Sequence, residues 1–146
     1  KSDGSPWRPI VHVEDIARAF LAVLAASRLV VHNEALNVGR NEENYRVRDL
    51  AEIVREVVVG SRIEYASDGG PDARSYRVDF GKIQRVVPEF RPQWDVRRGV
   101  EQLSAAYQAA GLTLEDFEGP RFHRGEYLKQ LLATGRVDDT LRWTGP

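Results

Sequence analysis

Short apolar runs and longer apolar stripes divide the chain into expected strands and helices. Residues 10–13 contain three β-branched side chains in a run too short for a helix, which predicts a buried strand. A second short strand is predicted at 34–39, where a glycine ends the run. The alternation of polar and apolar residues at 62–65 predicts a half-exposed strand, and 75–78 is expected to be extended.

Helical spacing of apolar residues accounts for most of the remaining chain. The first predicted helix, 15–26, is apolar on nearly all sides, so we expect it to be buried on more than one side. Further helices are predicted at 45–59 with Asn44 as cap, between Asp79 and Pro88, between Asp95 and Gly111, at 113–116, and at 122–133. This order predicts an α/β (α+β) fold, with a small sheet and helix-rich covering layers.

Composition narrows the possible partners. The chain has 146 residues, enough for one domain or most of one, and a net charge of −1. No broad electrostatic field therefore favours nucleic acid or an anionic membrane, and we expect neither as a partner. Cysteine is absent, which excludes a disulfide framework and a thiolate metal site. No apolar run approaches the roughly 20 residues of a membrane span. We expect a cytoplasmic protein without a bound metal.

The stretch around residues 7–17 carries the first candidate chemistry. Arg8 precedes the expected strand, and Glu14 and Asp15 place acidic groups at the start of the following helix, where an anion is favourable. The planar guanidinium of an arginine binds an oxyanion through two parallel hydrogen bonds, which the ammonium group of a lysine cannot do. The alternative is a solvated surface arginine beside Trp7. His12 lies within the apolar run, and we expect it to be a hydrogen-bonded structural histidine.

This arrangement resembles one family, the extended short-chain dehydrogenase/reductases, which include the NAD-dependent nucleotide-sugar epimerases and dehydratases. The residues that carry the resemblance are Arg8, the segment Val11-His12-Val13, the acidic pair that follows it, and Asn37-Val38-Gly39. The similarity extends over roughly residues 7–107. It implies the C-terminal portion of an extended Rossmann-type enzyme, with Arg8 on the diphosphate of a nucleotide-diphosphate sugar. Residues 1–111 would be the substrate-binding part, and 112–146 a helical extension packed on the same domain.

The loop at 70–76 supplies the other candidate binding residues. Its Gly/Pro composition, with Asp72, Arg74 and Tyr76, is similar to the family's loop, which implies that these residues bind the phosphates and the sugar or ribose hydroxyls. Many members begin this loop with an arginine, whereas this chain has Asp68-Gly69-Gly70. Either Arg74 alone contacts phosphate, or the pocket binds its ligand differently from other members of the family. The alternative is a polar surface turn.

Two motifs of such enzymes are missing. The chain has no G-x-x-G-x-x-G turn for a dinucleotide, and none of its five tyrosines has a lysine four residues later. We therefore expect NAD or NADP in the parent protein, no cofactor bound to this chain, no catalytic residue, and no activity of the chain alone. A turn at Asp3-Gly4 without a preceding strand suggests a missing N-terminal Rossmann half.

Open strand edges and an apolar first helix favour a homo-oligomer. The sequence leaves two alternatives open: a non-sugar NAD(P)-dependent reductase of the same family, or a non-catalytic binding or interaction module. It does not distinguish epimerisation from dehydration or reduction, or one nucleotide or sugar from another.

Overall fold

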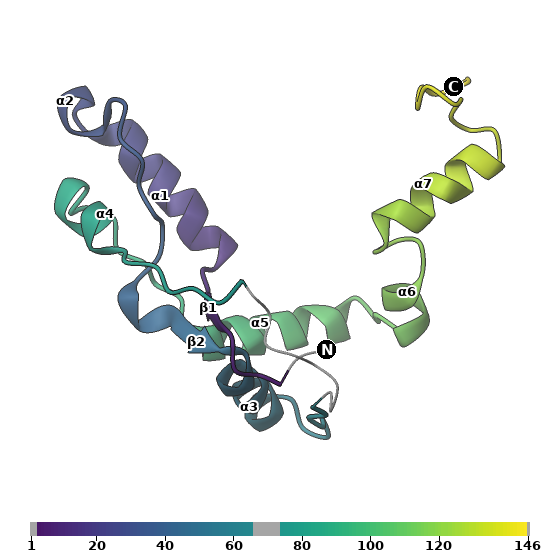
Figure 1. Ribbon diagram of the computed structural model, residues 1–146, viewed down its shortest axis with the longest axis horizontal. Helices are drawn as coiled ribbons and strands as arrows, with labels where there is room; N and C mark the ends of the chain where they lie inside the picture. The colour runs from purple at the N-terminus through teal and green to yellow at the C-terminus, as the bar shows by residue number, and fades with distance from the viewer. Residues whose placement is uncertain (1–2, 66–73, 146) are drawn as a thin grey trace. The chain divides into compact units, whose positions relative to one another are not determined.

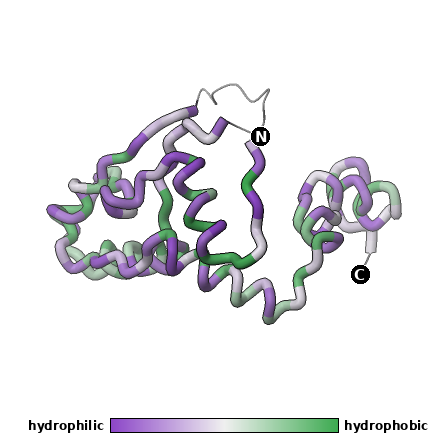
Figure 2. Tube along the Cα trace, turned by 90° about the horizontal axis from the view of Figure 1, so that it is seen from below, coloured by the Kyte–Doolittle hydropathy of each residue, from purple (hydrophilic) through white to green (hydrophobic). Residues whose placement is uncertain are grey.

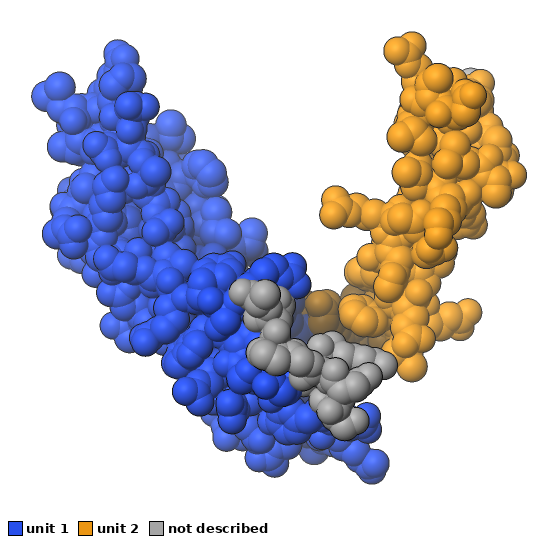
Figure 3. Space-filling model, viewed as in Figure 1, with its two compact units in different colours: residues 1–104 blue, residues 105–146 orange. Residues whose placement is uncertain are grey.

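The computed structural model describes residues 3–65 and 74–145. It forms two compact units, residues 1–104 and 105–146 (Figure 3), and each is considered by itself. Their boundary differs from the one expected at residue 111, which stays a prediction. The elements are β1 (Trp7–Pro9), α1 (Val13–Ala25), α2 (Arg28–Val31), a 3₁₀ turn (Asn41–Glu43), β2 (Asn44–Arg46), α3 (Val47–Val57), α4 (Gly81–Val86), α5 (Val96–Ala109), α6 (Leu114–Glu118) and α7 (Arg124–Ala133) (Figure 1).

The sheet is a two-stranded ribbon. β1 and β2 pair antiparallel, with Trp7 opposite Arg46 and Arg8 opposite Tyr45. A third extended segment runs beside β1, because the Tyr76 N–H donates to the Trp7 carbonyl at 3.4 Å. The strand predicted at 10–13 is therefore wrong in position: the ladder lies at 7–9. The reason is local, since the His12 side chain accepts the Glu14 N–H at 3.1 Å and so starts α1 at Val13.

Two other predicted strands are not formed among the described residues. The segment 62–65 has no ladder, and none of the N–H groups at 35–39 donates to a backbone carbonyl within 3–65 and 74–145. The segment 34–39 still has a strand-like burial pattern, because Leu36 and Val38 pack on the core while Ala35 and Asn37 are exposed. The alternation that predicted a strand is thus present, but the partner strand is not.

The core of the first unit is small. Ala19 of α1, Ile83 of α4, and Val87 and Phe90 after it form a buried cluster. Around them pack the partly buried residues Ala22, Val23, Ala26, Val31, Leu36, Val38 and Val86. The opposite face of α1 is open.

That open face carries Phe20 at 68%, Leu21 at 69% and Leu24 at 81% exposed. The expectation that this helix is buried on more than one side is therefore wrong for the described structure. Hydrophobic and hydrophilic residues are mixed along the chain (Figure 2), and no described helix is long and apolar enough to cross a membrane.

Helix ends follow the predicted chemistry with one correction. Asn44 does not cap α3; it lies in β2, and its amide bonds both the N–H and the carbonyl of Val78, at 2.9 and 3.0 Å. Asp95 does cap α5, because its carboxylate accepts the Arg98 N–H at 2.9 Å. Asp79 accepts the Gly81 N–H at the start of α4, also at 2.9 Å, and this hydrogen bond lowers the pKa of Asp79.

The second unit is built from α6 and α7. Thr113 and Asp116 form the predicted capping box, each side chain accepting the other's N–H at 3.1 Å. After α7, a bridge joins Val137 to Trp143, whose ring is 63% exposed. The predicted fold class is confirmed, because the described residues form a small two-stranded sheet and seven helices.

Candidate functional site

Two segments far apart in sequence meet at Arg8. Its Nη1 donates to the Trp7 carbonyl at 2.7 Å and to the carbonyl of Arg74. The guanidinium carbon lies 5.9 Å from the centroid of the Tyr76 ring, a cation–π distance. The main-chain N–H of Trp7 also donates to the Ser75 hydroxyl at 3.1 Å. The structure therefore brings three of the four predicted binding residues together, Arg8, Arg74 and Tyr76.

The fourth predicted residue, Asp72, lies outside the described residues, as does the loop head at 68–70 where this sequence departs from the family pattern. Arg74 is exposed, and Tyr76 is 53% exposed. Arg8 is half-buried. A half-buried guanidinium beside an accessible aromatic ring can bind an anionic group next to a planar one.

A buried carboxylate supports the ribbon behind this cluster. Glu43, 5% exposed, accepts the Val96 N–H at 2.9 Å, the Arg40 guanidinium at 3.0 Å and the Tyr45 hydroxyl at 3.2 Å. Burial raises the pKa of Tyr45, and the neighbouring Glu43 carboxylate raises it further. Because Tyr45 pairs with Arg8 across the ribbon, this network fixes the strand that carries Arg8.

Asp15 has a role that the sequence did not indicate. We expected it to face the first amides of its own helix, and it does lie in the first turn of α1. Its side chain, 1% exposed, instead accepts the N–H groups of Gln93 and Trp94, both at 2.9 Å. No local signal marks such a contact, because the partners lie 78 and 79 residues further along the chain.

His12 is structural, as expected, although it caps α1 rather than lying in a strand. Its Nδ1 accepts the Glu14 N–H, so its Nε2 carries the proton that is donated to Gln102 Oε1 at 2.6 Å. The ring stacks on Trp94, with centroids 3.9 Å apart. Within 3–65 and 74–145, no cluster of histidine and carboxylate groups could hold a metal ion.

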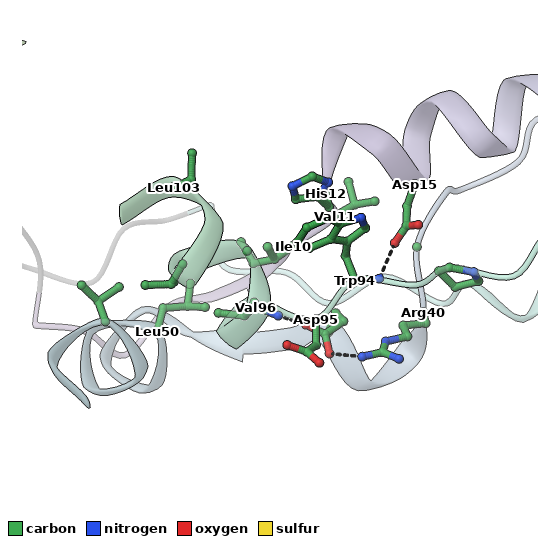
Figure 4. A pocket seen from close by; sticks show the side chains of 16 residues that line it. Ile10, Val11, His12, Asp15, Arg40, Leu50, Trp94, Asp95, Val96 and Leu103 are labelled. Atoms are coloured by element: carbon green, nitrogen blue, oxygen red, sulfur yellow. Dashed lines mark hydrogen bonds and ion pairs between the residues drawn. The ribbon is translucent and has the colours of Figure 1, made fainter. Parts of the chain in front are cut away.

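A largely apolar cavity of about 300 Å³ lies within the first unit (Figure 4). Its polar neighbours Asp15 and Glu43 already accept main-chain N–H groups, so they are committed to the fold. The wall consists of Ile10, Val11, His12, Asp15, Gly39, Arg40, Glu43, Leu50, Val54, Pro92, Trp94, Asp95, Val96, Gly99, Val100 and Leu103. The cavity therefore offers mainly apolar contact, and its two buried carboxylates are already bound to main-chain N–H groups.

The described residues do not fit NAD or NADP. A dinucleotide pyrophosphate needs a glycine-rich turn opening onto a helix N-terminus. The first turn of α1 carries Glu14 and Asp15, and that of α3 carries Asp49, so each bears negative charge where the pyrophosphate would lie. No hydride-transfer step can therefore be assigned to these residues.

Comparison with known protein families gives a match to the N-terminal part of the chain. The family described as the NAD dependent epimerase/dehydratase family matches residues 1–39, a segment that contains Arg8, α1 and Asn37-Val38-Gly39. The match supports a relationship to this NAD-dependent family, over a shorter stretch than the resemblance drawn from the sequence. Neither the search of curated proteins nor that of solved structures finds a match.

Proposed function

We propose that this chain is the substrate-binding portion of an NAD(P)-dependent epimerase or dehydratase, and that it binds a nucleotide-diphosphate sugar at Arg8, Arg74 and Tyr76. One observation carries the proposal: Arg8 contacts Arg74 and Tyr76 although the hydrogen bond between the two arginines spans 66 residues of sequence. The sequence pattern selected these residues independently of the fold.

The chemistry of the cluster suits such a ligand. Nη1 of Arg8 is held by two main-chain carbonyls, which orients the planar guanidinium before a ligand arrives. A diphosphate supplies the oxyanions that such a fork binds. The exposed Tyr76 ring beside it offers a surface for a base or a ribose. Asp72, in the same loop, belongs to the proposal on sequence grounds alone.

The proposal assigns cofactor and catalysis to a Rossmann half that joins this chain. Two features favour such a half: the segment 34–39 is extended without a ladder partner among the described residues (Figure 1), and the face of α1 that carries Phe20, Leu21 and Leu24 is open. A sheet edge supplied by that half would satisfy the backbone groups and cover the helix. NAD or NADP would bind there, and a cytoplasmic location remains part of the proposal.

Self-association of this chain is part of the same proposal. The extended segment 34–39 and the apolar face of α1 are each available to a second copy, and either one can form an interface about a two-fold axis.

Calorimetric titration of this chain tests the function. Uridine and thymidine diphosphates serve as probes, with the matching nucleosides as controls that lack the diphosphate. We expect the diphosphates to bind, the nucleosides to bind much more weakly, and NAD not to bind. Micromolar binding of NAD would contradict the assignment of the cofactor to another half. Equal binding of nucleoside and diphosphate, or no diphosphate binding, would contradict the diphosphate site and favour a non-sugar reductase or a non-catalytic module.

A further inference from the structure

The face of the ribbon that carries Trp7 holds two stacked arginines. Consecutive residues of a strand point to opposite faces, so Trp7 and its partner Arg46 lie on one face, and Arg8 and its partner Tyr45 on the other. The guanidinium carbon of Arg46 is 5.3 Å from the Trp7 ring centroid, and that of Arg77 is 4.7 Å from it. Three adjacent segments thus contribute one side chain each to a cluster, Trp7–Arg46–Arg77.

The charge of this cluster is not compensated within the part of the chain that the structure describes. Neither the Arg46 nor the Arg77 guanidinium makes an ion pair or a side-chain hydrogen bond with any residue in 3–65 or 74–145. Asp49, three residues after Arg46, accepts the main-chain N–H of Arg46 at 3.2 Å instead. By contrast, Arg18, Arg40, Arg55 and Arg97 each pair with a carboxylate.

Stacking leaves the hydrogen-bonding capacity of an arginine intact. A guanidinium contacts an aromatic ring through its flat face, while its N–H donors point outward in the plane. The ring also restricts the side chain, so less conformational entropy is lost when an oxyanion binds. Since the two guanidinium carbons lie 5.3 and 4.7 Å from one ring centroid, they are at most 10 Å apart, and the two forks can contact oxyanions along one chain of linked phosphate groups.

We infer that the Trp7–Arg46–Arg77 cluster is a second anion site, which binds a ligand carrying adjacent linked phosphate groups. It is separate from the Arg8 cluster, since the two lie on opposite faces of the ribbon, and it does not depend on the proposed function. Linked phosphates occur both in inorganic polyphosphate and in the phosphate chain of a nucleotide. The two sources share the chemistry that the arginines recognise, and the difference lies only in the attached nucleoside.

Binding of inorganic tripolyphosphate, measured by calorimetry in low salt, tests the site. The measurement uses the full chain carrying Arg8→Ala, so that the other cluster does not contribute. Arg46→Gln and Arg77→Gln should each weaken binding about tenfold or more, as loss of a charge-assisted hydrogen bond implies. Arg77→Lys should recover only part of the loss, because lysine lacks the fork. Adenosine diphosphate in a parallel titration shows whether a nucleoside adds affinity.

Arg91→Gln is the matched control, because Arg91 is exposed and removing it changes the net charge by the same amount. We expect this variant to bind tripolyphosphate like its parent. If it weakens binding as much as Arg77→Gln does, the attraction is non-specific and the site is refuted. If Arg46→Gln and Arg77→Gln bind unchanged while melting at the parent temperature, the cluster is a structural stack alone.

Discussion

The side chain of Arg8 donates a hydrogen bond to the main-chain carbonyl of Arg74. Arg8 lies in β1, and Arg74 lies 66 residues further along the chain. Their contact holds the segment that begins at Arg74 against β1, next to Tyr76. The hydrogen bond therefore keeps Arg74 and Tyr76 beside Arg8, in the cluster proposed to bind the nucleotide diphosphate.

Replacing Asp15 should destabilise the first unit strongly. Its buried carboxylate accepts the N–H groups of Gln93 and Trp94, and Asp15→Ala leaves both donors without an acceptor. We expect a loss of about 3 kcal/mol in the free energy of unfolding, measured by urea denaturation. Asp15→Asn keeps one acceptor oxygen and should lose less. Equal stability of Asp15→Ala and the parent would show that the two amides find other partners.

Gly39 is required by the ring of Phe80. A Cβ built on Gly39 would lie 2.7 Å from the Phe80 ring, and the backbone φ is +154°. Gly39→Ala should therefore cost about 1–3 kcal/mol of unfolding free energy. Gly60→Ala is the control, because φ is also positive there, at +86°, but no atom lies within 4 Å of the new Cβ. The contact explanation fails if Gly60→Ala is as damaging as Gly39→Ala.

Tyr45 of β2 should lose its proton at a higher pH than an ordinary tyrosine does. Burial and the Glu43 carboxylate raise the pKa of Tyr45 above its ordinary value. The folded state therefore favours the neutral phenol, and this contribution to stability is present below the unfolded pKa of about 10 and is lost as pH rises through the folded pKa. When the absorbance of tyrosinate is followed as pH rises, a step at high pH should be present in the parent and absent in Tyr45→Phe. If Tyr45→Phe instead removes absorbance that appears near the ordinary tyrosine pKa of about 10, the phenol is not shielded as the structure indicates.

Self-association should depend on the open face of α1. Leu24→Glu places a charge on a side chain that is 81% exposed, so it should leave the fold intact and weaken any dimer formed through this face. Val59→Glu is the control, because Val59 is 97% exposed and lies beyond the end of α3. Sedimentation should show a dimer for the parent and Val59→Glu, and a monomer for Leu24→Glu. A monomeric parent at high concentration would contradict the proposed homo-oligomer.

Sequence reasoning performs best where the determinants are local. The capping box at Thr113 and Asp116 and the Asp95 cap depend on neighbours within one turn, and both were predicted correctly. The longer helices were also predicted, whereas the short helix α2 was not. The strand positions were wrong, because a ladder depends on partners elsewhere in the chain. Apolar residues 10–13 resemble a strand, yet the pairing of β1 with β2 places the ladder at 7–9.

The candidate site shows the same division. Arg8, Arg74 and Tyr76 were selected by residue type and order, and the structure brings them together. The carboxylates that support the site were missed, since Glu43 and Asp15 act through main-chain N–H groups supplied by the segment 93–96. A sequence shows that an acidic residue is present, but not which distant amide it accepts. The stack of Arg46 and Arg77 on Trp7 was missed for the same reason.

Nucleoside diphosphate binding by Arg8 variants tests the central claim most directly. Arg8→Ala should weaken binding about ten- to a hundredfold, the value of one charge-assisted hydrogen bond of about 1.5–3 kcal/mol. Arg8→Lys should recover part of it, because the charge returns without the fork. Arg91→Ala, at an exposed position, should bind like the parent. If Arg8→Ala binds uridine and thymidine diphosphates as tightly as the parent does, Arg8 is not part of the diphosphate site and the account is contradicted.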